Sequence, residues 1–168
     1  MKSEMSDSFN NITFDRNKRP SIDFDIFTLE DVLQRKNLNH DPRTPHRVQF
    51  YVLILVTAGL GKHTIDFKEH TLEKGSLLTI RKNQIHNFHH GNANGFVLVF
   101  TEEYVLSYME QQSSDKISAL FNELLYNQHS QLNDDQLKET LSLFSQIEHE
   151  FSQPMDDHTS AIIRSLLQ

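Results

Sequence analysis

Histidine is the residue type in this sequence best suited to chemistry, and two of the ten histidines stand where a site is expected. His46 and His86 each lie at one end of an expected buried strand. Because strand side chains alternate between faces, His46 shares its face with Val48, and His86 shares its face with Phe88. A histidine inside an apolar barrel is either a core residue bonded to the backbone or a polar group of a ligand pocket. The residues alone leave both interpretations open.

Most other histidines are expected to lie outside a site. His89 and His90 precede Gly91 and are typical of the edge of a turn. Five more stand in polar loops or on polar helix faces, where solvated imidazoles need no special role. They are His40, His70, His129, His149 and His158.

The usual catalytic arrangements are missing from the sequence. Asp66 follows His63, but strand alternation puts the two side chains on opposite faces. Gly59-Leu-Gly61 stands between two expected strands and predicts a hairpin turn rather than a phosphate-binding loop. Without cysteine there is no thiol nucleophile, thiolate metal site or disulfide. We therefore predict no catalytic residues.

Short apolar segments separated by turn residues predict a β-sandwich or barrel. The longest segment, residues 48–58, is rich in β-branched and aromatic residues and predicts one strand buried on both faces. Residues 22–26 alternate apolar and acidic side chains, which predicts a half-buried strand. Further short strands are expected at residues 63–67, 71–72, 76–80, 85–89 and 96–101.

Helical periodicity replaces the strand pattern after residue 101. Helices are predicted over residues 102–109 and 117–125, and a last one begins at Ile162 and reaches the end of the chain. Between them, residues 133–135 form a natural N-cap for a helix with a stripe of apolar side chains. The stripe is Leu137, Leu141, Phe144, Ile147 and Phe151. A short helix through Leu33 is also expected, because Thr28 and Asp31 resemble a capping box.

Charge is distributed unevenly along the chain, whose net charge is −7. Residues 1–100 carry 13 basic and 11 acidic side chains, whereas residues 101–168 carry 3 basic and 12 acidic ones. Nucleic-acid binding depends on Lys and Arg that neutralise phosphates, so these residues are not expected to bind DNA themselves. No apolar run approaches the ~20 residues of a membrane span, and the polar start does not resemble a signal peptide. We therefore expect a cytoplasmic protein without membrane contact.

Two segments resemble the sensor domain of AraC-type transcriptional regulators. They are residues 46–67, with Gly59 and Gly61, and residues 72–86, with Gly75. In that family an N-terminal cupin barrel binds a small effector, the following helices mediate dimerisation, and a C-terminal domain binds DNA. The resemblance extends over about residues 22–168 and follows the same order of strands and then helices.

The fold class that follows is α+β and mainly β, with a cupin-like double-stranded β-helix barrel and then a C-terminal helical segment. We predict a polar N-terminal arm over residues 1–20, the barrel over 21–101, and a helical dimerisation and linker segment over 102–168. The resemblance also implies that a DNA-binding domain follows in the full-length protein. The weak basic charge and the last helix, which ends abruptly at Gln168, fit that expectation.

The resemblance also bears on metal binding. Many cupins bind a metal through two histidines and a glutamate of one motif and a histidine of a second motif. Those positions correspond here to His46, Val48, Val52 and His86, and valine has no lone pair to offer. Two imidazoles alone bind a metal only weakly, so we predict neither a metal nor another cofactor.

The predicted ligand pocket combines apolar barrel residues with two histidines. By resemblance, Phe88 and Val97 stand where the sugar-binding member of the family has larger, polar-capable aromatic residues that contact its effector. Their replacement argues against a sugar, which needs several hydrogen-bond partners. An apolar effector, or a hydrophobic carboxylate paired with an imidazolium, suits this pocket better. The predicted ligand-binding residues are His46, Val48, Phe50, Val52, His86, Phe88 and Val97.

The stripe from Leu137 to Phe151 has two interpretations that the sequence leaves open. It either packs on the outer face of the barrel, which is the usual use of an amphipathic helix, or forms a two-helix dimer seam, as the family implies.

These observations predict the effector-sensing and dimerisation region of an AraC-family regulator, with a small-molecule effector and a homodimer. Effector entry would reorder the polar arm and change the orientation of the DNA-binding domains. Two alternatives remain. One is a free-standing small cupin enzyme, of the isomerase or dioxygenase type, that uses His46 and His86. The other is a sensor domain controlled by a protein partner.

Overall fold

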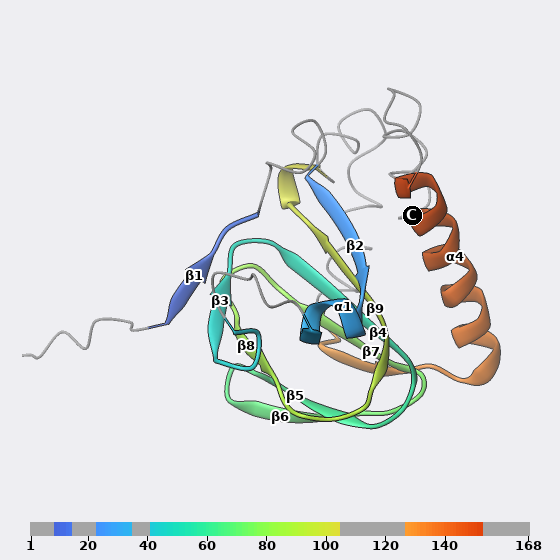
Figure 1. The fold of residues 1–168 in the computed structure, drawn as a ribbon, viewed down its shortest axis with the longest axis horizontal. Helices are drawn as coiled ribbons and strands as arrows, with labels where there is room; N and C mark the ends of the chain where they lie inside the picture. Colours follow the sequence, from blue (N-terminus) through green and yellow to red (C-terminus); the bar gives the residue numbers. More distant parts are fainter. Residues whose placement is uncertain (1–8, 15–22, 35–40, 105–126, 153–168) are drawn as a thin grey trace, which may run out of the picture.

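The chain folds into two five-stranded sheets that face each other, with a long helix beside one of them (Figure 1). This computed structural model describes residues 9–14, 23–34, 41–104 and 127–152. Sheet A has the strand order β1-β3-β8-β5-β6, and sheet B has the order β10-β7-β4-β9-β2. The mainly β fold with a C-terminal helix confirms the predicted class.

The two sheets differ in the length of their strands. Sheet A contains β1 (Asn10–Ile12), β3 (His46–Val48), β8 (Ile85–Phe88), β5 (Gly61–Ile65) and β6 (Lys68–Leu72). Sheet B contains β10 (His129–Gln131), β7 (Ser76–Ile80), β4 (Tyr51–Ala58), β9 (Asn94–Phe100) and β2 (Phe24–Thr28). From β3 to β9 the chain passes repeatedly from one sheet to the other, as in a double-stranded β-helix.

The segment predicted as one strand over residues 48–58 divides into β3 and β4, which belong to different sheets. The division falls at Gln49, whose backbone N–H donates to the carbonyl of Ile12 at 2.9 Å. Its side-chain amide also donates to the Oδ1 atom of Asn11 at 2.7 Å. The prediction of a single strand was wrong because apolar periodicity does not report which neighbour each half pairs with.

The turn predicted at Gly59-Leu60-Gly61 is a crossing between the sheets rather than a hairpin, because β4 and β5 do not pair with each other. Gly59 has a φ of 78°, and a Cβ atom there would lie 2.1 Å from the carbonyl oxygen of Asn92. Glycine is therefore required for the close approach of these two loops as well as for the backbone conformation.

Both predicted N-caps that fall on described residues are confirmed. The α1 helix (Leu29–Gln34) begins where the N–H of Asp31 donates to Thr28 Oγ1 at 3.1 Å. The α4 helix (Asp134–Ser152) follows a reciprocal capping box. Asn133 Oδ1 accepts from the N–H of Gln136 at 2.9 Å, and Gln136 Oε1 accepts from the N–H of Asn133 at 3.0 Å. The helices predicted over 117–125 and from 162 onward lie outside the described residues, as does most of the helix predicted over 102–109.

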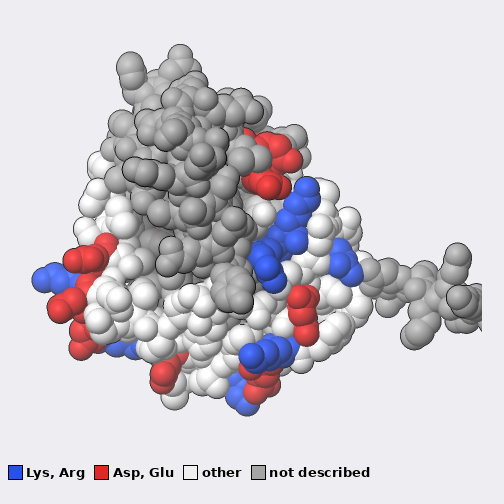
Figure 2. Space-filling model, turned by 180° about the vertical axis from the view of Figure 1, so that it is seen from behind, with Lys and Arg blue, Asp and Glu red and all other residues white. Residues whose placement is uncertain are grey.

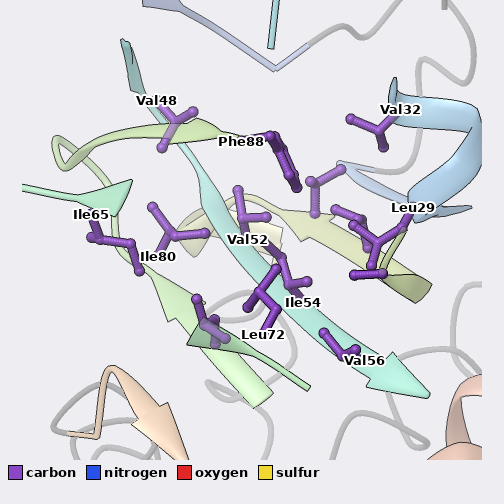
Figure 3. Close-up of a cluster of buried hydrophobic side chains, with 14 residues drawn as sticks. Leu29, Val32, Val48, Val52, Ile54, Val56, Ile65, Leu72, Ile80 and Phe88 are labelled. Carbon is purple, nitrogen blue, oxygen red and sulfur yellow. The ribbon is translucent and has the colours of Figure 1, made fainter. Parts of the chain in front are cut away.

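Two apolar clusters lie on opposite faces of sheet B. The inner core fills the space between the sheets, and Figure 3 shows side chains from several strands converging there. Its buried members are Leu29, Val32, Val48, Val52, Ile54, Val56, Ile65, Leu72, Leu78, Ile80, Phe88, Ala93, Val97 and Val99. The outer core joins sheet B to α4, and its buried members are Phe24, Ile26, Tyr51, Leu55, Leu98, Phe100, Tyr104, Leu137, Phe144 and Ile147.

The described part of the N-terminal arm lies along the edge of sheet A. The β1 strand pairs in parallel with β3, so that Asn10 stands opposite His46. After it, Phe14 packs edge-on against Phe50 with the ring centroids 5.9 Å apart. Part of the segment predicted as a loose arm over residues 1–20 therefore adds a strand to the sheet, and the predicted domain boundaries stay predictions.

Candidate functional site

The structure gathers all seven predicted ligand-binding residues at the interior of the barrel. The four that belong to the inner core are Val48, Val52, Phe88 and Val97, and Phe50 packs against that core from a half-buried position. His46 and His86 stand opposite each other on β3 and β8, and their exposed fractions are only 4% and 3%. The structure thus shows that the seven residues lie together, whereas their contact with a ligand stays a prediction.

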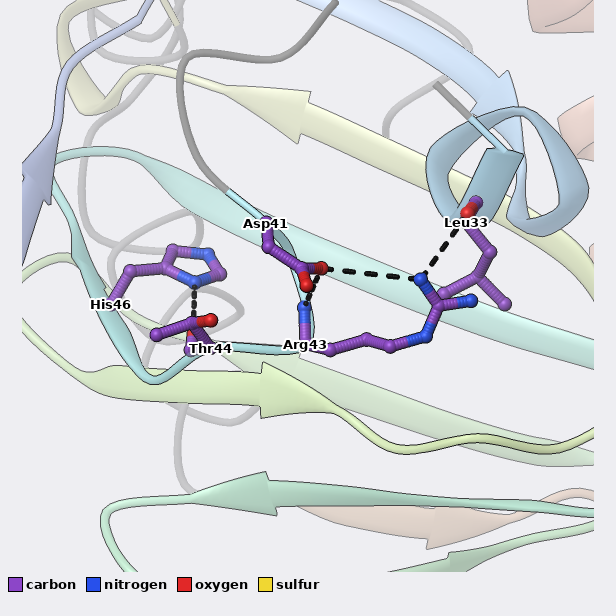
Figure 4. Close-up of polar contacts among 5 residues, drawn as sticks. All are labelled: Leu33, Asp41, Arg43, Thr44 and His46. Atoms are coloured by element: carbon purple, nitrogen blue, oxygen red, sulfur yellow. Dashed lines mark hydrogen bonds and ion pairs between the residues drawn. The ribbon is translucent and has the colours of Figure 1, made fainter. Parts of the chain in front are cut away.

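His46 is anchored at the end of the barrel by the backbone. Its Nδ1 atom lies 2.8 Å from the carbonyl oxygen of Thr44, as Figure 4 shows, so Nδ1 carries the hydrogen and donates it. Its ring lies 4.4 Å from the ring of His86, measured between centroids. The backbone bond fixes the direction of the imidazole, as expected for a core histidine, and the neighbouring ring makes it part of a polar cluster.

A third inward-facing histidine, His63, was missed by the sequence reasoning. It is fully buried on β5, and its Nε2 atom lies 2.9 Å from Nδ1 of His86. Its ring also packs edge-on against Phe88, with a centroid distance of 4.4 Å. The one available signal was that His63 shares its face with the apolar Ile65. The pairing of β5 with β8, which brings His63 to His86, is not visible in the sequence.

Burial sets the protonation state of His63. Its pKa falls from 6.5 to about 3, mainly because burial disfavours the charged imidazolium, and further because His46, His89 and His70 lie nearby. His63 is therefore neutral at pH 7. It does not supply the imidazolium that a carboxylate ligand would require.

His70 corrects a prediction, because it is buried rather than solvated, with 7% of its surface exposed. It stands opposite His63 in the β5–β6 pair, so both side chains lie on the inner face of sheet A. Its ring also meets that of His129 on β10, with centroids 5.4 Å apart. The prediction was wrong because His129 comes from a strand almost 60 residues further along the chain.

Loss of hydration lowers the pKa of the buried His70 and, through partial covering of its ring, that of His129. His129 also acts on His70, since two imidazolium ions would repel each other. His129 and His149 are exposed, as predicted, and His40 and His158 lie outside the described residues.

The clustered imidazoles do not form a metal centre. The facing nitrogens of His63 and His86 share a hydrogen, so they point at each other and not at a common ligand position. In the described ranges, no group of three or more histidine, aspartate or glutamate side chains could hold a metal ion.

The loop before β3 is hydrogen-bonded to both β8 and α1. The N–H of Phe88 donates to the carbonyl of Pro42 at 3.0 Å. Arg43 reaches from this loop to α1, where its Nη1 atom donates to the carbonyl of Leu33 at 3.4 Å (Figure 4). Arg43 thus ties the loop to the helix.

Figure 2 shows the charged side chains of the described residues on one face of the molecule. On that face, basic and acidic side chains are interspersed among uncharged ones. No helix in the described part of the chain is long and apolar enough to cross a membrane.

A two-sheet barrel with a few polar groups facing an apolar interior defines a ligand-binding domain of the cupin type. The chain belongs to the family of AraC-like ligand binding domains, whose match spans residues 32–166. No curated protein sequence matches the chain.

Several solved structures are similar to this chain. An apo variant of ToxT from Vibrio cholerae is 11% identical, with a TM-score of 0.49, and the match covers 86% of this chain and 53% of ToxT. The AraC-like transcriptional activator CuxR is 11% identical, with a TM-score of 0.47, over 86% of this chain and 50% of CuxR. The plu4264 protein from Photorhabdus luminescens is 21% identical, with a TM-score of 0.35, over 53% of this chain and 84% of that protein. The chain thus spans about half the length of ToxT and of CuxR.

Proposed function

We propose that this chain is the effector-sensing and dimerisation region of an AraC-family transcriptional regulator, which binds DNA through a further domain of the full-length protein. The observation that carries the proposal is the convergence of His46 and His86 with the apolar pocket residues at one interior surface of an AraC-like ligand binding domain. Few polar groups on an apolar wall are typical of a small-molecule site.

The effector that suits this wall is an apolar molecule, or one with a hydrophobic body and a carboxylate. The interior offers many aliphatic and aromatic contacts and few hydrogen-bonding groups, which disfavours a sugar. Because His63 is neutral at pH 7, the imidazolium partner of a carboxylate would be His46 or His86. Those are the two histidines that the sequence predicted for this role.

The arm offers a route from the pocket to the rest of the regulator. The β1 strand lies beside His46, and Phe14 covers the pocket residue Phe50. An effector that displaces or tightens these contacts would shift the population between two arrangements of the arm. The shift requires that the effector bind one arrangement more tightly than the other.

Thermal unfolding with benzoate as the probe tests the ligand class. A site with a Kd of about 10 µM would stabilise the protein by about 2.7 kcal/mol when the free ligand concentration is about 100 times the Kd. We expect benzoate to raise the Tm of the wild-type chain, and to raise it less for His86→Phe. Leu60→Ala, on an exposed loop, is the matched control and should respond like the wild type. If millimolar benzoate leaves every Tm unchanged, the proposed carboxylate class is wrong.

Deletion of residues 1–20 tests the role of the arm. We expect the barrel to fold without them, because the described residues that are lost are the edge strand β1 and the residues beside it, including Phe14. Effector binding or the effector response of the full-length regulator should change. An unaltered response would remove the arm from the mechanism.

Dimerisation through α4 needs a surface that the barrel leaves free. Three of the five residues predicted for a dimer seam, Leu137, Phe144 and Ile147, are buried against sheet B of the same chain. Leu141 packs partly on that cluster, and the side chain of Phe151 lies outside the described residues. The packing alternative thus accounts for the buried part of the stripe, because a side chain covered by its own barrel is not available to a second copy.

A homodimer would instead use the outward face of α4, where Leu143 is 41% exposed. Sedimentation equilibrium of the wild type and of Leu143→Glu tests this arrangement. We expect a dimer that the substitution weakens at least tenfold in Kd, while Leu60→Glu leaves the dimer intact. A monomeric wild type would contradict the dimer proposal.

A further inference from the structure

On the neighbouring strands β5 and β6, two buried imidazole nitrogens have no hydrogen-bond partner among the described residues. They are Nδ1 of His63, which is fully buried, and Nε2 of His70. Buried polar atoms in folded proteins are almost always hydrogen-bonded, and an orphaned one lowers stability. Such an atom therefore calls for a partner that the described residues do not provide.

The strand register places these two imidazoles on the same surface. His63 and His70 are direct partners in the antiparallel β5–β6 pair, so their side chains lie side by side on the inner face of sheet A. The neighbouring inward positions on these strands are occupied by Ile65 and Leu72 of the inner core. The two nitrogens thus lie beside apolar side chains of the inner core, at the β5–β6 side of the histidine cluster.

The hydrogen bond between His63 and His86 limits which group can bind to His63. In a neutral imidazole one nitrogen donates and the other accepts. If Nε2 of His63 donates to His86, its Nδ1 atom is an acceptor, and if Nε2 accepts, Nδ1 is a donor. A hydroxyl group satisfies either tautomer because it both donates and accepts. A carboxylate satisfies only the second, and its burial without a positive partner is costly.

We propose that His63 and His70 form a polar subsite within the barrel that receives a hydroxyl group of the effector. The inference rests on the proposed function, because it places the effector at this interior. It adds His63 and His70 to the residues predicted for the pocket, and it adds a hydroxyl group to the features expected of the effector. An effector with an apolar body would thereby be selected by a hydroxyl as well as by its shape.

Three probes with the same six-membered aromatic ring separate the possibilities: phenol, toluene and benzoate. Binding is measured by isothermal titration calorimetry and by the rise in Tm at pH 7.5. We expect phenol to bind at least tenfold more tightly than toluene. Benzoate reports on His46 and His86 rather than on this subsite.

Two substitutions at one position distinguish the subsite from a structural role. The side-chain amide of His63→Gln can replace Nε2, which bonds to His86, and leaves the Nδ1 position empty. The amide of His63→Asn does the reverse. We expect His63→Gln to bind phenol and toluene within twofold of each other, and His63→Asn to keep most of the preference for phenol. A purely structural role for His63 predicts that neither amide alters the ratio of the two affinities.

The same pair of substitutions can be made at His70, with the roles of glutamine and asparagine exchanged. This second pair tests the subsite if the His63 variants fail to fold. Here the unpartnered atom is Nε2, so His70→Asn should remove the preference for phenol and His70→Gln should retain it. Equal binding of phenol and toluene to the wild type would overturn the subsite and would leave the proposed function standing. If none of the three probes binds, the proposed ligand class and the subsite both fail.

Discussion

The two sheets of this barrel share an interior but contribute to it in different ways. The inner face of sheet B is aliphatic, with Val52, Ile54 and Val97 among its buried side chains, and its outer face is covered by α4. The inner face of sheet A carries four histidines, on β3, β8, β5 and β6. They are His46, His86, His63 and His70.

The difference teaches how one small barrel combines stability with selectivity. Strands buried on both faces stabilise a fold through apolar contact, and sheet B has such strands at its centre. Sheet A has the same number of strands, but they are shorter, and polar groups on its inner face cost stability unless they are hydrogen-bonded. We expect the scaffold in sheet B and the chemistry in sheet A to respond differently to substitution, pH and ligands.

The largest effect is expected from Ile54→Ala in β4. Ile54 is completely buried in the inner core, and removal of such a side chain costs about 2–5 kcal/mol through lost apolar burial and a residual cavity. Urea unfolding monitored by circular dichroism measures the loss. Leu60→Ala removes an exposed side chain and should change the free energy of unfolding by less than about 0.5 kcal/mol. Equal losses of unfolding free energy in the two variants would contradict this prediction.

A smaller effect, specific to sheet A, is expected from pH. Below pH 6.5 the unfolded chain binds a proton at His63 that the folded chain, with a pKa of about 3, does not bind. The free energy of unfolding therefore decreases as the pH is lowered, by about 2 kcal/mol from pH 7 to pH 5. The lowered pKa values of His70 and His129 act in the same direction.

Urea titrations at pH 7, 6 and 5 measure this slope, and His63→Gln should reduce it because glutamine does not titrate. Carboxylates contribute little in that window, since they remain ionised above pH 5. A slope that is the same in His63→Gln would show that His63 is not the group responsible.

An effect of about 1 kcal/mol is expected where α4 joins sheet B. Asn133→Ala removes the oxygen that caps the N–H of Gln136. The loss should be visible in urea unfolding at pH 7 and independent of pH down to 5. Ser142→Ala, on the exposed side of the same helix, serves as the control. A loss at Asn133 no larger than at Ser142 would mean that the capping box does not stabilise α4.

The smallest effect, and the only gain, is expected at the β5–β6 turn of sheet A. Phe67 is 74% exposed and has a φ of 67°, a conformation that disfavours a bulky side chain. Phe67→Gly should stabilise the chain by up to about 1 kcal/mol, less what is lost with the contact to Phe9. Asn83→Gly is the matched control, since Asn83 has a φ of 73° and asparagine tolerates it. A destabilised Phe67→Gly would show that the contact with Phe9 outweighs the strain.

Particular residues show how far the sequence reached. Strand alternation correctly placed His46 with Val48 and His86 with Phe88, because a period of two depends only on local backbone geometry. The caps at Thr28 and Asn133 were also predictable, since each involves residues three positions apart. The same local reasoning joined β3 to β4 and made Gly59 part of a hairpin, because neither error is visible without the partner strands.

The sequence by itself determined the alternation of barrel strands, the amphipathic α4, and two of the inward-facing histidines, His46 and His86, with their apolar neighbours. These follow from short-range periodicity and from the resemblance to the AraC-like family. Only the tertiary structure decided that His63 meets His86, that His70 is buried beside it, and that the stripe of α4 is covered by sheet B. Each of those contacts depends on which distant strand lies alongside, and that choice is fixed by the packing of the whole barrel.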